Sequence, residues 1–190
     1  MNSLNSLFVR NDLVIRAEQA WSIEKLARQG SQSIALGQTR IVQDCSWLSK
    51  PAIIARVWNW LPVLYTADRD GDHWQDVEET LRRRAGDCED WSILLAAVLK
   101  RLGIDARIGV MPGHAAVFVP IWNVPPLSML LGQIDPQELI PANWQLINYG
   151  GHRWLALEST VPPEQRRLPG EHLDLIAPAV AERSLIIASP

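Results

Sequence analysis

The chain has 190 residues, enough for one domain with its own hydrophobic core. Hydrophobic residues make up 47% of it and charged residues 21%, which is the balance of a folded protein and not of a disordered one. The formal net charge of −3 offers no basic surface for a nucleic acid, and two cysteines cannot form a disulfide framework.

The N-terminal sequence predicts neither a secretion signal nor a membrane span. Residues 1–10 lack a basic region followed by a long apolar run. The most apolar early run, residues 51–64, is short and is interrupted by Arg56, Asn59 and Pro62. We therefore expect a location in the cytoplasm or in a larger particle.

The first third of the chain is predicted to be helical. Residues 12–29 mix apolar and charged side chains at helical spacing, and Gly30 is expected to end that helix. Residues 34–44 fit either a helix or a strand. A further helix is expected to begin near Ser49, with Pro51 in its first turn, and to continue to Trp60. These segments form the N-terminal helical region, residues 1–66, of a single domain over residues 1–190.

An acidic loop follows, from Asp68 to Trp74. Its alternating aspartates resemble a calcium-binding loop, but His73 occupies the position where the sharp turn requires glycine. A solvated loop is therefore the preferred interpretation. A helix over residues 74–84 comes next. Its three terminal arginines are typical of a helix C-terminus, where positive charge complements the helix dipole. The alternative is that these arginines bind an acidic peptide.

The central helix is predicted over residues 89–102, where apolar side chains recur every three or four residues up to Gly103. Asp87 is a good N-cap, which puts Cys88 at or next to the first helical position. The helix dipole and the free N–H groups there favour a thiolate, while the flanking carboxylates of Asp87 and Glu89 oppose it. The alternative is that Cys88 is an inert buried residue.

Four strands are expected after this helix. Residues 105–111 and 114–120 read as an antiparallel pair, with His114 opening the second strand. Residues 144–149 and 152–160 read as a hairpin across a Gly-Gly turn. Glu158 ends that hairpin among apolar neighbours, where a carboxylate needs a partner. His114 is a candidate partner. Cys88 as nucleophile, His114 as base and Glu158 as orienting acid could then form a catalytic triad. A solvated Glu158 is the alternative.

Two segments complete the chain. Residues 122–143 contain four prolines and are long for a connection, which predicts a lid or a substrate-binding loop, or a surface segment covering the sheet edge. Residues 162–190 form a C-terminal tail whose last apolar stretch is expected to dock on the body or on a partner.

The order of these pieces resembles the transglutaminase-like cysteine peptidases of the papain-like superfamily, of the bacterial transglutaminase-like cysteine proteinase type. The segments that carry the resemblance are residues 74–81, 86–90, 102–107, 113–115 and 154–160. The resemblance implies an α+β fold in which a helix bearing the cysteine packs on an antiparallel sheet, after an N-terminal helical region. The implied catalytic core is residues 67–161.

The same resemblance implies a function. Cys88 would be the nucleophile, His114 the general base and Glu158 the orienting acid of a thiol hydrolase or acyltransferase that acts on amide bonds of a protein or peptide. Its oxyanion donors would be the backbone N–H of Cys88 and, as a weaker choice, Trp74. Two features depart from the family pattern, since the acid is more often aspartate and the gap between Ala115 and Glu158 is wide.

No cofactor is required by this chemistry. In periplasmic members of the family that clip adhesins, acidic residues flanking the cysteine help to bind calcium, which makes Asp87 and Glu89 candidate calcium ligands. The rival hypothesis is a non-catalytic interaction or assembly module that keeps the fold, for example as a component of a virion.

Overall fold

The computed structural model describes residues 2–34, 40–45, 48–61, 64–68, 73–120, 146–162, 176, 179 and 184–188, with the backbone alone at residues 2–13 and 40. The predicted insertion, residues 122–143, lies outside the described residues. So do Asp70 and Asp72 of the acidic loop and most of the tail at residues 162–190.

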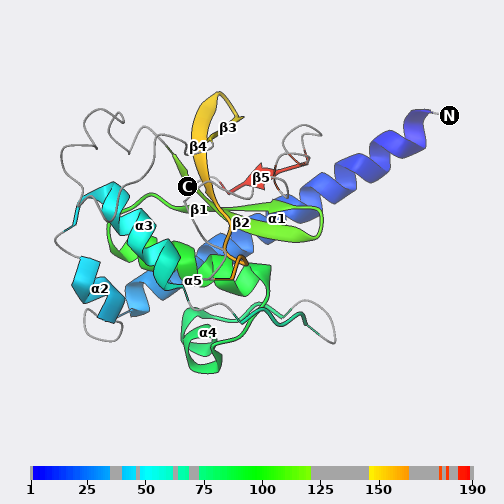
Figure 1. Ribbon diagram of the computed structural model, residues 1–190. Helices are drawn as coiled ribbons and strands as arrows, with labels where there is room; N and C mark the ends of the chain where they lie inside the picture. The colour runs from blue at the N-terminus through cyan, green and yellow to red at the C-terminus, as the bar shows by residue number, and fades with distance from the viewer. Residues whose placement is uncertain are drawn as a thin grey trace.

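Five helices are described. They are α1 (Asn2–Ser33), α2 (Arg40–Cys45), α3 (Lys50–Trp60), α4 (Val77–Arg83) and α5 (Cys88–Arg101). The predictions of α3 and α5 are confirmed, with Pro51 in the first turn of α3 and Asp87 capping α5. The segment at residues 34–44, which fitted either a helix or a strand, is helical from Arg40 on, and α2 ends one residue beyond it, at Cys45. In Figure 1, α1 passes behind the other helices and its N-terminal half extends beyond them.

The prediction that Gly30 ends the first helix was wrong, because α1 continues to Ser33. Gly30 serves close packing instead. A Cβ atom there would lie 2.2 Å from Val77 Cγ2 and 3.4 Å from Ala97 Cβ, so only glycine lets α1 approach α4 and α5 this closely.

Helix α4 begins three residues later than predicted. Asp76 is its N-cap and accepts a hydrogen bond from the backbone N–H of Glu79 at 2.8 Å. Trp74 and Gln75 therefore lie in the segment that leads into α4.

Among the described residues, five strands form one sheet: β1 (Arg107–Met111), β2 (His114–Pro120), β3 (Leu146–Tyr149), β4 (His152–Leu157) and β5 (Ile186–Ile187). The strand order is β3-β4-β2-β1-β5, and each neighbouring pair is antiparallel. Both residues of the β3–β4 turn, Gly150 (φ 58°) and Gly151 (φ 78°), have the positive φ that such a turn requires. The predicted hairpin is thus confirmed, although β4 ends before Glu158.

The sheet separates two hydrophobic clusters. Ala115, Val117 and Val119 of β2 join the larger cluster with the helices, whereas Ala116 and Phe118 join the smaller one on the other face. Helix α5 lies at the centre, and Figure 1 shows it between the other helices and the sheet. Each residue of α5 from Asp90 to Leu99 is buried. Packing along the helix therefore holds its first turn, which carries Cys88, in place.

The fold is therefore α+β, with the cysteine-bearing helix packed on an antiparallel sheet after an N-terminal helical region, as predicted. None of the described helices combines the length and apolar character that crossing a membrane requires. The division of the chain at residues 66 and 161 stays a prediction.

Candidate active site

Cys88 is the first residue of α5 and is held there by a reciprocal cap. The Asp87 carboxylate accepts hydrogen bonds from the backbone N–H groups of Glu89 (3.1 Å) and Asp90 (3.2 Å), and the Asp90 carboxylate accepts one from Asp87 N–H at 3.2 Å. The sequence signal for this arrangement is an acidic residue three positions after the cap.

Asp90 is fully buried and receives two more hydrogen bonds, from the backbone N–H (2.7 Å) and the side-chain amide (2.6 Å) of Gln75. The indole N–H of Trp91 donates to the carbonyl oxygen of Gly86 at 3.0 Å. The segment before α5 is therefore fastened to the helix on both sides of Cys88, and the position of the cysteine is rigid.

His114 and Glu158 form a hydrogen-bonded pair. The distance from His114 Nε2 to Glu158 Oε2 is 2.5 Å, and the Glu158 side chain is fully buried. The second carboxylate oxygen accepts from the backbone N–H (2.9 Å) and the hydroxyl (2.6 Å) of Thr160. The carboxylate thus has partners for both oxygens, and it fixes the orientation of the imidazole.

The charge state of Glu158 follows from these contacts. Burial acts to raise its pKa, but the hydrogen bond and charge of His114 and the two hydrogen bonds from Thr160 outweigh burial, so the pKa lies below its usual value. Two buried links hold the segment in place: Trp58 Nε1 donates to the backbone carbonyl of Glu158 at 2.8 Å, and Ser92 and Ser159 hydroxyls lie 3.0 Å apart.

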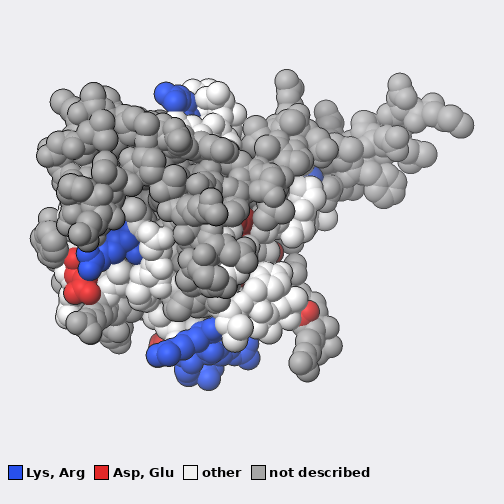
Figure 2. Space-filling view, viewed as in Figure 1, with Lys and Arg blue, Asp and Glu red and all other residues white. Residues whose placement is uncertain are grey.

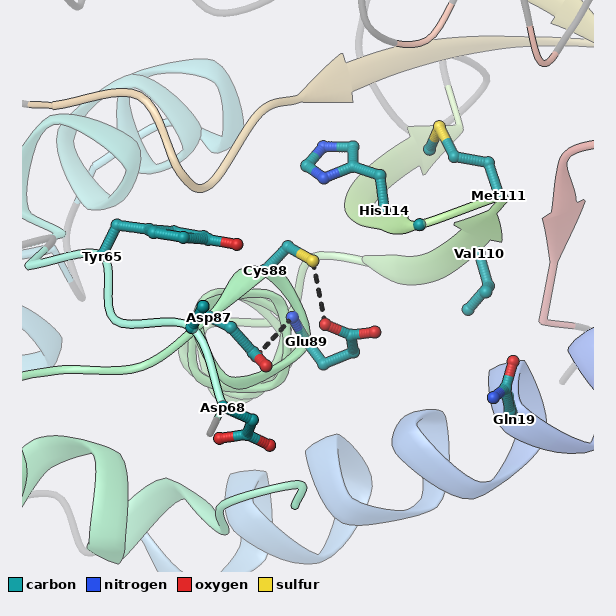
Figure 3. Close-up of a pocket in the computed structure, with 11 residues that line it drawn as sticks. Gln19, Tyr65, Asp68, Asp87, Cys88, Glu89, Val110, Met111 and His114 are labelled. Atoms are coloured by element: carbon teal, nitrogen blue, oxygen red, sulfur yellow. Dashed lines mark hydrogen bonds between the residues drawn. The ribbon is translucent and has the colours of Figure 1, made fainter. Parts of the chain in front are cut away.

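Cys88 and His114 line one pocket of about 340 Å³. Figure 3 shows both side chains at this pocket, the sulfur from the start of α5 and the imidazole from the start of β2. The backbone N–H of Ala115, next to His114, also donates a hydrogen bond to the sulfur. The structure therefore brings the predicted nucleophile to the strand that carries the predicted base, and the base to the predicted acid.

The Cys88 side chain is only 6% exposed, and its pKa is raised. Burial is the largest cause. The Glu89 charge and the hydrogen bond from the sulfur to Glu89 Oε2, at 2.8 Å, come next, and the charge of Asp87 adds to them. Burial and the two carboxylates together outweigh the hydrogen bond from Ala115, so the resting form is a neutral thiol that needs a base.

The pocket is acidic. Asp68, Asp87 and Glu89 line it, and burial together with the charges of Asp90 and Glu89 raises the pKa of Asp87 to about 7. Within the described residues, no group of three or more His, Cys, Asp or Glu side chains is arranged to hold a metal ion. Asp87 caps the helix, and Glu89 accepts a hydrogen bond from the Cys88 thiol. Calcium at these two residues stays a prediction and enters no step below.

Two other predicted contributors lie elsewhere. Trp74 is not among the residues that line the pocket, and its buried indole N–H has no hydrogen-bond partner in the described part of the chain. Its role as an oxyanion donor stays a prediction. Arg82, Arg83 and Arg84 are exposed around the end of α4 and do not line the pocket either. Figure 2 shows a basic patch over that helix.

Sequence reasoning missed Tyr65 and Gln19, which both line the pocket. Tyr65 reaches it because its segment runs beside the residues before Cys88, with a bridge between Tyr65 and Gly86. Gln19 comes from the middle of α1. Neither residue belongs to a local motif, so nothing in the sequence around them signals the site.

Residues 41–124 match the family model described as the transglutaminase-like superfamily. This match includes Cys88 and His114 and ends before Glu158. A search of curated proteins found no match for the chain.

Proposed function

Since the chain belongs, through residues 41–124, to the transglutaminase-like superfamily, we propose that it is a thiol hydrolase or acyltransferase acting on amide bonds of a protein or peptide. The observation that carries the proposal is the pocket that holds Cys88 together with His114, whose imidazole is hydrogen-bonded to Glu158.

The chemistry follows from the roles of the three side chains. His114 takes the proton of the Cys88 thiol, and the sulfur then attacks the carbonyl carbon of the amide. When the C–N bond breaks, the leaving amine takes that proton from His114 and an acyl-enzyme remains. Water activated by His114 then releases an acid, which is hydrolysis, or an amine takes the acyl group, which is transfer.

Glu158 keeps the histidine in the tautomer and orientation that this cycle needs. Its lowered pKa keeps it ionised at neutral pH, so it stabilises the imidazolium that forms when the thiol loses its proton. The family match supports the reaction class. The pocket shared by Cys88 and His114 and the hydrogen bond between His114 and Glu158 support the assignment of roles.

A second candidate is an assembly module that has kept the fold without the activity. The observation that favours it is the resting state of Cys88, which is nearly buried and donates a hydrogen bond to Glu89 at 2.8 Å. In an assembly module this contact would be permanent, because no substrate would enter the pocket.

Alkylation with iodoacetamide at neutral pH separates the two functions. The chain contains an internal reference, Cys45, which is fully buried and, like Cys88, forms no disulfide. For an enzyme we expect Cys88 to be labelled selectively, as measured by peptide mass spectrometry. His114→Ala should slow that labelling by about 10²-fold or more, Glu158→Gln should slow it less, and the exposed His152→Ala should not change it.

Equal, slow labelling of Cys45 and Cys88, unaffected by His114→Ala, would support the assembly module and exclude the enzyme.

A further inference from the structure

Tyr65 is fixed next to the nucleophile by its backbone. The N–H of Thr66 donates to the carbonyl oxygen of Gly86 at 2.9 Å, and the N–H of Gly86 donates to the carbonyl oxygen of Leu64 at 3.2 Å. Tyr65 therefore lies between two ladder hydrogen bonds to Gly86, two residues before Cys88. The position of the tyrosine is tied to the start of α5 itself.

The side chain of Tyr65 faces the pocket. It lines the same pocket as Cys88 and His114, and Figure 3 shows its ring extending over the pocket with the hydroxyl turned toward Cys88. The residue is 54% exposed, so its ring is accessible to a molecule that enters the pocket. A substrate in the pocket would contact this ring and its hydroxyl.

The electrostatic surroundings keep the hydroxyl protonated. Burial, followed by the charges of Cys88, Asp87 and Glu89, raises the pKa of Tyr65 above its usual value of 10.0. The phenol is thus a hydrogen-bond donor over the whole range in which a cysteine hydrolase works.

The other polar groups near Cys88 are less suited to donate to a new oxyanion. The side-chain amide of Gln75 already donates to Asp90 at 2.6 Å. Trp74 does not line the pocket, and in Figure 3 Glu89 stands between Gln19 and the sulfur. His114 must hold the proton that it passes to the leaving group.

We propose that Tyr65 is a catalytic residue of this site, donating a hydrogen bond from its hydroxyl to the oxyanion, beside the backbone N–H of Cys88. The inference rests on the proposed function. As the C–S bond forms, the π electron pair of the carbonyl moves onto oxygen, and Tyr65 stabilises that charge without giving up its proton. When the C=O bond re-forms, the leaving group departs with the proton from His114.

Two reactions of Cys88 test this role, because only one of them develops an oxyanion. Acylation by p-nitrophenyl acetate passes through a tetrahedral oxyanion, whereas alkylation by iodoacetamide is a displacement at saturated carbon. Tyr65→Phe should slow the acylation burst by about 10²-fold and change the alkylation rate by less than about twofold. Tyr149→Phe is the matched control, since the chain has two tyrosines, and should change neither rate.

The possible results distinguish a catalytic Tyr65 from a structural one, and a failure of this inference from a failure of the proposed function. Equal loss of acylation and alkylation in Tyr65→Phe would make Tyr65 a structural residue, and unchanged acylation would remove it from the mechanism. If the wild-type protein shows no burst that Cys88→Ser abolishes, the proposed function itself fails and this inference with it. A wild-type burst with no effect of Tyr65→Phe overturns the inference alone.

Discussion

Glu89 is the second residue of α5. Its sequence position predicts a carboxylate that complements the helix dipole, opposes a thiolate at Cys88 and is a candidate calcium ligand. In the structure its carboxylate accepts a hydrogen bond from the Cys88 thiol at 2.8 Å, and it is the strongest charged influence on that thiol. One side chain therefore stabilises the helix and at the same time holds the nucleophile in its neutral form.

Replacing this carboxylate tests that influence. Glu89→Gln removes the negative charge, so the pKa of the Cys88 thiol should fall and the pH profile of iodoacetamide alkylation should move to lower pH. Each unit of that shift increases the thiolate fraction about tenfold below the pKa. Glu78→Gln, at an exposed glutamate in the first turn of α4, is the control and should leave the profile unchanged. An unmoved profile in Glu89→Gln would show that Glu89 does not influence the thiol pKa.

At the scale of elements, the site depends on how closely α1 and α4 approach α5. Gly30 of α1 faces Val77 of α4 and Ala97 of α5, with no room for a methyl group. The residues just before α4 in turn include Gln75, which binds Asp90 in the first turn of α5. Packing between helices thus continues directly into the cap that positions Cys88.

The substitution Gly30→Ala has two opposite effects on stability: it favours the helical conformation of α1, and it introduces a clash between helices. Alanine favours the helical conformation by about 1 kcal/mol over glycine, yet its Cβ would lie 2.2 Å from Val77 Cγ2. We expect the clash to prevail and the free energy of unfolding to fall by about 1–3 kcal/mol, as measured by urea denaturation. Gln32→Ala, at an exposed position of α1, should change stability little. A stabilised Gly30→Ala protein would contradict the close approach of α1 and α4.

At the scale of the whole molecule, Glu24 joins three elements that are far apart in the sequence. Its side chain is 2% exposed, forms an ion pair with Lys100 of α5 at 2.6 Å and accepts a hydrogen bond from the backbone N–H of Ile108 in β1 at 3.0 Å. Lys100 also donates to the carbonyl oxygen of Ala106. The N-terminal helix is therefore part of the domain that carries the site.

Loss of this ion pair should destabilise the whole fold. Glu24→Gln leaves the Lys100 ammonium, which is 15% exposed, without its carboxylate partner. We expect the free energy of unfolding to fall by about 3 kcal/mol in a urea titration with a single transition. Glu18→Gln, at an exposed position of the same helix, is the control. A biphasic transition, in which α1 separates before the rest unfolds, would contradict the integration of α1 into one cooperative unit.

The sequence by itself determined the features that depend on neighbouring residues. Asp87 before Cys88 specifies a capped helix start, two adjacent glycines specify the β3–β4 turn, and the apolar period of α5 specifies a buried helix. These signals are local, since capping, positive φ and periodicity involve residues a few positions apart. The pairing of His114 with Glu158 was inferred from the need of a buried carboxylate for a partner.

Only the tertiary structure decided the rest. It brought Tyr65 beside the cysteine, turned Glu89 toward the thiol and made Gly30 a packing residue instead of a helix end. Each of these depends on contacts or orientations that local patterns do not encode: a bridge to Gly86, the rotamer of one glutamate, and the approach of two other helices. The balance between the helix dipole and the carboxylates at Cys88 was open in the sequence for the same reason, because burial and distance set its sign.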